Sequence, residues 1–141
     1  MRSAPDDISE TLAGLAIFAD LSRPEVERIA HTLEERYFGQ DERVLREGLS
    51  GSAFYIILDG EAAVIAGGKR VNTLRRGEFF GEISVLLGEA PVADVIAARP
   101  LRCLVLPGEL LKGFLQTNPR VCYRILEAEA RKLANATRRG G

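Results

Sequence analysis

Histidine, cysteine and tryptophan are scarce in this sequence. Its 141 residues contain one histidine, His31, two cysteines, Cys103 and Cys122, and no tryptophan. A zinc site or a histidine general base would rest on His31 alone, and no neighbouring residue completes such a motif. Both cysteines lie in apolar contexts without metal-ligand spacing, so we expect buried, reduced thiols. The sequence therefore predicts no metal site.

The common catalytic motifs are missing as well. The sequence has neither the Gly-x-Ser-x-Gly motif of serine hydrolases nor a phosphate loop that ends in Gly-Lys-Ser or Gly-Lys-Thr. Without a nucleophile, a general base or a metal-ligand set, enzymatic chemistry has little support. We predict no catalytic residues and no cofactor, and we expect that the chain is not an enzyme.

Excess charge and long apolar runs are also lacking. Nineteen Lys and Arg residues stand against twenty Asp and Glu residues, which gives a formal net charge of −1. Such a balance provides no overall field that would attract nucleic acid or an anionic membrane. No apolar run at the start suits a signal peptide, and none approaches the roughly 20 residues of a membrane span. The expected location is the cytoplasm, without membrane association.

The length is typical of one domain, and we predict a single domain over residues 1–141. Helices are expected at its N-terminal end, over residues 7–32. The first covers about 7–16. The second begins with a capping box formed by Ser22 and Glu25, with a proline in its first turn. The apolar positions at helical spacing are Ile8, Leu12, Leu15, Val26, Ile29 and Leu33.

Short apolar runs broken by Gly, Asp and Pro occupy residues 33–106. This pattern is typical of many short strands in an antiparallel sandwich or barrel. Gly67-Gly68 predicts a hairpin turn with two positive φ angles, and Asp59-Gly60 a second turn or a sharp bend. The runs are Val44-Leu45, Phe54 to Leu58, Ala62 to Ala66, Val71 to Leu74, Val92 to Ala98 and Leu101 to Leu106.

Helical periodicity returns over residues 107–137. One helix is expected to end near Asn118-Pro119, and the last to run from Pro119 to about Thr137. The first carries Leu110, Leu111, Phe114 and Leu115 on one face, and the second an apolar stripe of Cys122, Ile125, Leu126 and Leu133. The fold class is therefore α+β: about eight short strands between N-terminal helices and two C-terminal helices.

The stretch from Arg76 to Val95 has the features of a ligand-binding segment. Gly81 allows a tight backbone approach, and residues 83–87 form about one helical turn with unpaired N-terminal amides, which attract anions. The alternative is an ordinary surface turn between strands, because single glycines are common in turns.

Two motifs, Gly51-Ser-Ala-Phe-Tyr-Ile-Ile-Leu-Asp-Gly-Glu61 and Phe80-Gly-Glu-Ile-Ser-Val-Leu-Leu-Gly-Glu89, resemble the cyclic nucleotide-binding domain family. The resemblance implies a jelly-roll barrel with a phosphate-binding cassette at residues 80–95. Gly81, Ile83 and Ser84 would offer amides or a hydroxyl to the cyclic phosphate, and Glu82 would accept a hydrogen bond from the ribose. The C-terminal helices would form a lid with Arg131 as a candidate contact, and the last helix often forms a dimer interface.

The cassette departs from the family pattern at one position. In the family, an arginine binds the phosphate through its planar guanidinium group. Aligned without gaps from Gly81-Glu82, its position holds Pro91. Aligned on the proline instead, it holds Val92, followed by Ala93 and Asp94. Losing such a charged partner costs on the order of 2 to 5 kcal/mol, or roughly 30- to 3000-fold in affinity. On the second alignment Asp94 would bring a negative charge towards the phosphate. Replacement cations could come from Arg75, Arg76, Arg99 or Arg102.

The sequence thus supports two main hypotheses. In the first, the chain is a regulatory sensor module with weak or altered ligand binding, which acts through its C-terminal helix on a protein partner or a second copy. In the second, a relocated cation preserves binding of cyclic AMP or cyclic GMP. A cupin-type enzyme is a third reading, disfavoured by the single histidine. Because the last predicted helix is followed only by Gly140-Gly141, we expect no DNA-binding domain in this chain, which would be either a free-standing module or a piece of a longer protein.

Overall fold

The computed structural model describes residues 5–49 and 53–140. Its N-terminal part contains α1 (Pro5–Ala13), the short 3-10 helix η1 (Ala16–Phe18) and α2 (Arg23–Ala30). The capping box is confirmed: Glu25 N donates to Ser22 Oγ at 3.4 Å, and Ser22 N donates to Glu25 Oε1 at 2.8 Å. The first helix ends earlier than the predicted residue 16, because the chain tightens into η1, which buries Ile17 and Phe18.

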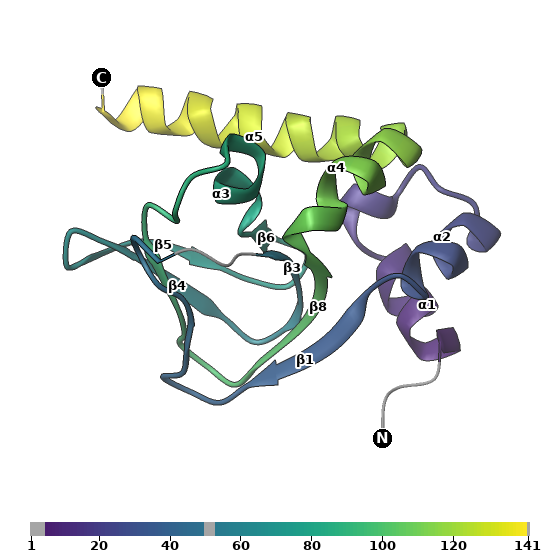
Figure 1. Ribbon diagram of the computed structural model, residues 1–141, viewed down its shortest axis with the longest axis horizontal. Coiled ribbons are helices and arrows are strands. Elements are labelled where there is room, and N and C mark those ends of the chain that lie inside the picture. The colour runs from purple at the N-terminus through teal and green to yellow at the C-terminus, as the bar shows by residue number, and fades with distance from the viewer. Residues whose placement is uncertain (1–4, 50–52, 141) are drawn as a thin grey trace.

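Two four-stranded antiparallel sheets form the centre of the described structure (Figure 1). One has the order β1-β8-β3-β6 and the other the order β2-β7-β4-β5. The strands are β1 (Glu34–Phe38), β2 (Arg43–Leu45), β3 (Ala53–Asp59), β4 (Ala62–Ala66), β5 (Lys69–Leu74), β6 (Phe79–Phe80), β7 (Asp94–Ala97) and β8 (Leu101–Pro107). The predicted antiparallel barrel with about eight strands is confirmed.

Sequence analysis missed two of these strands. β1 is a mostly exposed, polar strand, paired with β8 through a register that joins Glu34 to Val105 and Phe38 to Leu101. β6 has only two residues and pairs with β3. Neither gives an apolar run of normal strand length, so the pattern on which strand prediction depends is absent.

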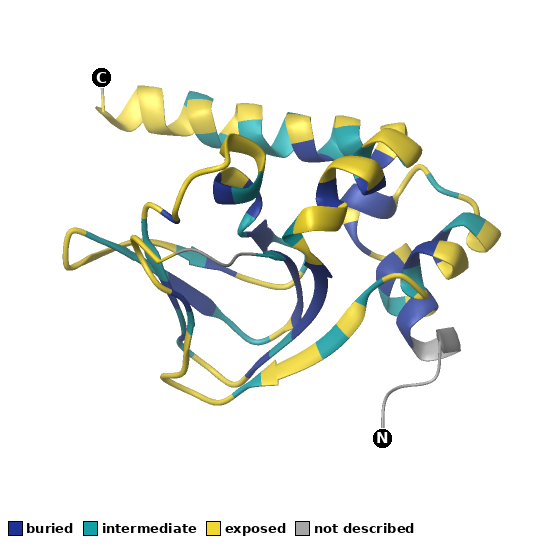
Figure 2. Cartoon of the chain, viewed as in Figure 1, coloured by how far each residue is buried: buried dark blue, intermediate teal, exposed yellow. Residues whose placement is uncertain are grey.

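The core lies on both faces of β3 (Figure 2). Phe54 and Ile56 pack with the helices, whereas Tyr55 and Ile57 face the interior of the barrel. The prediction of a strand buried on both faces is therefore confirmed. Cys103 is buried in the barrel and Cys122 is half-buried, and both are free thiols.

Glycines make the predicted turns. Gly67 and Gly68 have φ angles of 59° and 76°, as expected for a primed hairpin. Gly60 has a φ of 95°, and a Cβ atom there would lie 2.1 Å from the carbonyl oxygen of Pro100. The strand can bend at this corner because residue 60 has no side chain.

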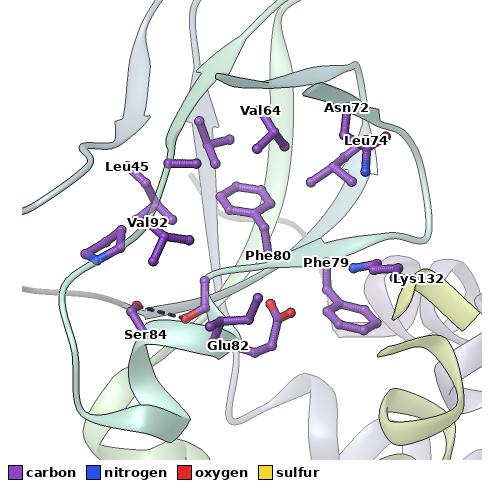
Figure 3. Close-up of a pocket in the computed structure, with 15 residues that line it drawn as sticks. Leu45, Val64, Asn72, Leu74, Phe79, Phe80, Glu82, Ser84, Val92 and Lys132 are labelled. Carbon is purple, nitrogen blue, oxygen red and sulfur yellow. Dashed lines mark hydrogen bonds between the residues drawn. The ribbon is translucent and has the colours of Figure 1, made fainter. Parts of the chain in front are cut away.

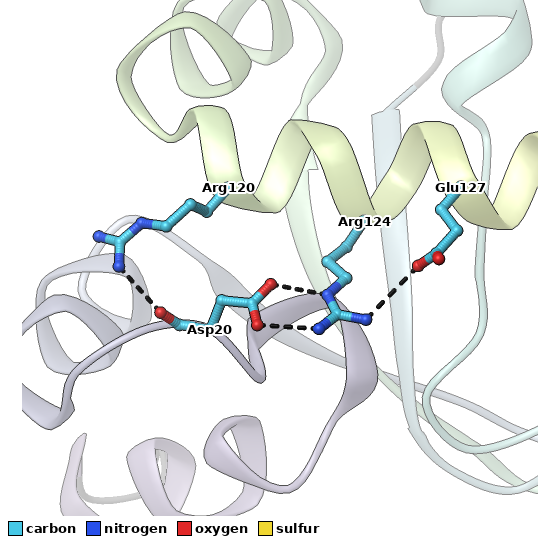
Figure 4. A network of polar contacts seen from close by, with 4 residues as sticks. All are labelled: Asp20, Arg120, Arg124 and Glu127. Carbon is cyan, nitrogen blue, oxygen red and sulfur yellow. Dashed lines mark hydrogen bonds and ion pairs between the residues drawn. The ribbon is translucent and has the colours of Figure 1, made fainter.

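Two helices complete the described chain, α4 (Gly108–Thr117) and α5 (Pro119–Gly140), and α5 runs across the structure over the short helix α3 (Glu82–Leu87) (Figure 1). Arg124 in α5 donates two hydrogen bonds to the Asp20 carboxylate, at 2.7 and 2.8 Å (Figure 4). Arg120 pairs with Glu25 and donates to the Asp20 carbonyl oxygen. These contacts hold the start of α5 against the N-terminal helices.

The predicted apolar stripe of α5 divides into two parts. Val121 and Ile125 are buried against the core. Leu126 and Leu133 are instead 63% and 69% exposed. Helical periodicity places the apolar residues but does not show which of them find a partner within the chain. None of the described helices is long and apolar enough to cross a membrane.

Candidate functional site

The short helix α3 (Glu82–Leu87) follows directly from β6 and matches the predicted helical turn. Gly81 begins it with a φ of 91°, and a Cβ atom at this position would lie 2.0 Å from the carbonyl oxygen of Ala53. Only glycine fits such an approach. As a result, the start of α3 lies directly against β3, and the Glu82 side chain is buried at 3% exposure.

A cavity of about 200 Å³ lies between α3, the barrel strands and α5 (Figure 3). All seven residues that the cassette resemblance indicates lie along it: Gly81, Glu82, Ile83, Ser84, Pro91, Val92 and Ala93. The other lining residues are Leu45, Val64, Asn72, Leu74, Phe79, Phe80, Val95 and Lys132. The structure thus brings the predicted site together, although the contacts of each residue with a ligand remain predictions.

Most of the cavity wall is apolar, and its polar groups are few. Ser84 Oγ donates to the carbonyl oxygen of Gly81 at 3.3 Å. Asn72 and Lys132 reach the cavity from β5 and α5, and sequence analysis missed both. Neither residue belongs to a recognisable sequence motif, because only the fold brings β5 and α5 next to the cassette. An apolar cavity with a few polar groups is typical of a small-molecule site.

Glu82 is the unusual polar group in this cavity. Its Oε1 atom is buried and has no hydrogen-bond partner in the described structure. Burial, followed by the neighbouring Glu129 carboxylate, raises the pKa of Glu82 to about 8, and Lys132 opposes the change. The Glu82 carboxyl group is therefore mostly protonated near neutral pH. An unpaired buried carboxyl group normally finds a partner in a ligand or water.

We expect replacement of Glu82 by glutamine to change how stability depends on pH. The pKa of Glu82 lies above its ordinary value of 4.5, so the folded chain retains a proton that the unfolded chain releases between about pH 4.5 and 8. Wild-type stability therefore falls across this window, and Glu82→Gln removes that fall. Urea unfolding at pH 5 and pH 8 should show the stability difference between variant and wild type shift by about 2 to 4 kcal/mol. Parallel pH profiles would contradict this assignment.

The candidate replacement arginines do not line the cavity. Arg75 and Arg99 lie 3.5 and 3.9 Å from the Glu61 carboxylate. Arg76 donates to the Leu58 carbonyl oxygen at 3.4 Å, and Arg102 pairs with Glu35. Among the described residues that line the cavity, Lys132 is the one cation.

Three further predicted residues lie outside this cavity. Asp94 accepts a hydrogen bond from Glu47 N at 2.7 Å and lies 3.9 Å from Arg43, and it does not line this cavity. Arg131 lines a neighbouring cavity beside η1 and α5, and its role as a lid contact remains a prediction. His31 caps the C-terminal end of α2, outside the strands. No group of three or more His, Cys, Asp or Glu side chains among the described residues could hold a metal ion.

Comparison with known families agrees with this geometry. Residues 35–118 match the profile of the cyclic nucleotide-binding domain. This chain belongs to the cyclic nucleotide-binding domain family. The matched segment includes the whole barrel and the cassette, so the jelly-roll fold implied by the resemblance is confirmed together with the family.

Relatives place this family domain in larger proteins. The chain is 31% identical over 119 residues to a cGMP-dependent protein kinase of Eimeria tenella, a match that covers 84% of the chain and 12% of the kinase. The chain thus spans about an eighth of the length of that relative. A second relative is a cAMP-dependent protein kinase regulatory subunit of Mucor circinelloides f. lusitanicus, 38% identical over 100 residues, which are 67% of this chain and 23% of the subunit.

Two solved structures share the fold. The regulatory subunit of a cAMP-independent protein kinase A from Trypanosoma cruzi, bound to guanosine, matches 96% of this chain and 50% of its own with a TM-score of 0.76 and 22% identity. A triple mutant of the corresponding subunit from Trypanosoma brucei, with a threonine-to-arginine change and cAMP bound in the A site, matches 88% of this chain and 51% of its own. Its TM-score is 0.68 at 24% identity.

Proposed function

We propose that this chain is a non-catalytic regulatory module whose pocket takes an uncharged nucleoside-like ligand and binds cyclic AMP and cyclic GMP only weakly. One observation carries the proposal. The cavity contains the buried carboxyl group of Glu82, whose Oε1 atom has no hydrogen-bond partner in the described structure, whereas Pro91, Val92 and Ala93 present no cation at the other end of the cassette. The site retains the group expected for a ribose and lacks the one expected for a phosphate.

The phosphate half of the site is incomplete. A cyclic phosphate needs a fixed cation because its negative charge must leave water when it enters an apolar cavity. None of the four candidate arginines lines the cavity, and Lys132 is already 3.4 Å from the Glu129 carboxylate. A loss of roughly 30- to 3000-fold, as estimated for an absent charged partner, would weaken a micromolar ligand to about millimolar.

The other half of the site suits a nucleoside. Apolar side chains such as Val64, Leu74 and Phe80 offer a surface for a base, and the Glu82 carboxyl group can exchange a hydrogen bond with a ribose hydroxyl. The guanosine-bound subunit from Trypanosoma cruzi supports this ligand class.

The surface through which this module would contact another protein is the outer face of α5. Tyr123, Leu126, Ala130 and Leu133 are all exposed, and they alternate at spacings of three and four residues along the helix. This spacing is typical of a coiled-coil seam. We infer that α5 transmits the state of the pocket to a second copy of the chain or to a helix of a partner protein.

The alternative function is binding of cyclic AMP or cyclic GMP with the help of a relocated cation. Lys132 is the observation that favours it, because it is the one cation on the cavity wall of the described structure. An ammonium group lacks the planar fork of a guanidinium, so it can replace the missing arginine only in part. Under this alternative, Lys132→Met would weaken the binding of cyclic AMP or cyclic GMP at least tenfold. Under our proposal, the same variant leaves the affinity for nucleosides unchanged.

Nucleoside binding is the direct test of the proposal. Saturation-transfer NMR and calorimetry with adenosine and guanosine should detect binding to the wild-type chain. Glu82→Ala should weaken it by at least about tenfold, because a ligand hydroxyl loses its buried partner. Glu89→Ala is the matched control, since it removes an exposed carboxylate just after the other end of α3. Equal affinity for wild type and Glu82→Ala, or no binding of either nucleoside, would count against the proposal.

A further inference from the structure

Lys132 lines the cavity from the middle of α5 and has a carboxylate partner on the same helix. Lys132 Nζ lies 4.6 Å from the centre of the Phe79 ring and 3.4 Å from Oε1 of Glu129, one helical turn earlier. Both contacts hold the ammonium group at the cavity wall (Figure 3). The charge of Lys132 is therefore balanced within its own helix before any ligand enters.

Glu129 acts on α3 as well as on Lys132. The burial of Glu82 and the Glu129 carboxylate together raise the pKa of Glu82, so the Glu82 carboxyl group keeps its proton near neutral pH. With Lys132 at +1, Glu129 at −1 and Glu82 neutral, this end of the cavity has no net charge. Figure 3 shows Glu82 and Lys132 at one side of the cavity and Val92 at the other.

We propose that Glu129 is a specificity-determining residue that prevents the pocket from accepting anionic ligands. It pairs at 3.4 Å with Lys132, the one cation that lines the described cavity. An incoming phosphate therefore meets a neutral end of the cavity or, when both carboxyl groups ionise, a negative one. An uncharged nucleoside is not repelled. This inference rests on the proposed function, because it explains how the same pocket would select uncharged ligands over anionic ones.

Removal of the Glu129 charge should change this selection. Glu129→Gln leaves Lys132 without its carboxylate partner and changes the net charge of the group from neutral to +1. Two charges separated by several ångströms near a protein surface interact strongly enough to change affinity by about tenfold or more. The variant should therefore bind cyclic AMP at least tenfold more tightly than wild type, and adenosine within about threefold of wild type.

Calorimetry on the full chain, with cyclic AMP and adenosine as probes, tests this inference. The double variant Glu129→Gln, Lys132→Met should lose the gain for cyclic AMP, because the freed ammonium group is absent. Glu127→Gln is the matched control: it lies on the same helix, contacts Arg124 at 3.4 Å and lines the neighbouring cavity, so it should change neither affinity. Thermal unfolding confirms that each variant is folded.

The outcomes distinguish the inference from the function on which it rests. No gain for cyclic AMP in Glu129→Gln, including no binding at all, overturns the inference. An equal gain for adenosine also overturns it, because a general loosening of α5 would then explain the result. If wild type binds no adenosine, the proposed function fails, whereas a tenfold gain for cyclic AMP that depends on Lys132 still supports the role of Glu129.

Discussion

Replacement of Val92 by arginine is expected to raise the affinity for cyclic AMP by roughly 30- to 3000-fold. Val92 lines the cavity and is also 66% exposed, so a guanidinium group can reach a ligand phosphate without displacing the core. The new side chain would restore a planar, charged donor at the end of the cassette that lacks one. Calorimetric titration of wild type and variant with cyclic AMP measures the change.

Two control variants separate charge and geometry from size. Val92→Met adds length without charge and should leave the affinity close to that of wild type. Val92→Lys adds charge without the planar fork and should give a smaller gain than arginine. Pro91 is less suitable for the substitution, because it is buried and its carbonyl oxygen accepts a hydrogen bond from Gly48 N at 2.9 Å. Equal affinities for wild type and Val92→Arg would show that the missing arginine does not limit binding.

Replacement of Gly81 by alanine is expected to lower the free energy of unfolding by about 3 kcal/mol or more. Two causes add together. The φ of 91° is strained for any residue with a side chain, and the new Cβ would lie 2.0 Å from the carbonyl oxygen of Ala53. Either β3 or α3 must move, and Glu82 would move with α3. Urea denaturation monitored by circular dichroism provides the measurement.

Gly88 supplies the matched control at the other end of α3. Its φ of 67° is also positive, but no atom lies within 4 Å of a Cβ built there. Gly88→Ala should therefore cost only the backbone strain, about 1 to 2 kcal/mol. Similar losses for the two variants would mean that the close approach of Gly81 to β3 contributes nothing to stability, contrary to the site geometry described above.

The barrel could be predicted from sequence because its strands are short apolar runs separated by turn residues. Phe54 to Leu58 and Leu101 to Leu106 fall within β3 and β8, and Gly67-Gly68 forms the expected turn. β1 escaped prediction because Glu34 to Phe38 is polar and held by pairing with β8 rather than by its own burial. Tertiary pairing outweighs local preference in such a strand.

The candidate site was predictable only where its residues are adjacent in sequence. The motif from Gly81 to Ser84 shows in the sequence because one glycine and one carboxylate must stand next to each other at the start of α3. Asn72 lies on β5 before the cassette, Glu129 and Lys132 lie far from it on α5, and no local pattern distinguishes them from solvated surface residues. The sequence alone does not show whether the candidate arginines reach the ligand. In the structure, ion pairs such as that of Arg75 with Glu61 hold them outside the cavity.

Titration of the wild-type chain with cyclic AMP is the measurement that tests the account most directly. The central claim is that a cassette without its arginine, opposite a balanced charge group on α5, binds the cyclic phosphate weakly. We predict no detectable heat of binding at low micromolar concentrations of cyclic AMP, and a dissociation constant of about millimolar by NMR. A dissociation constant of about 1 μM or below for unmodified chain would contradict the claim.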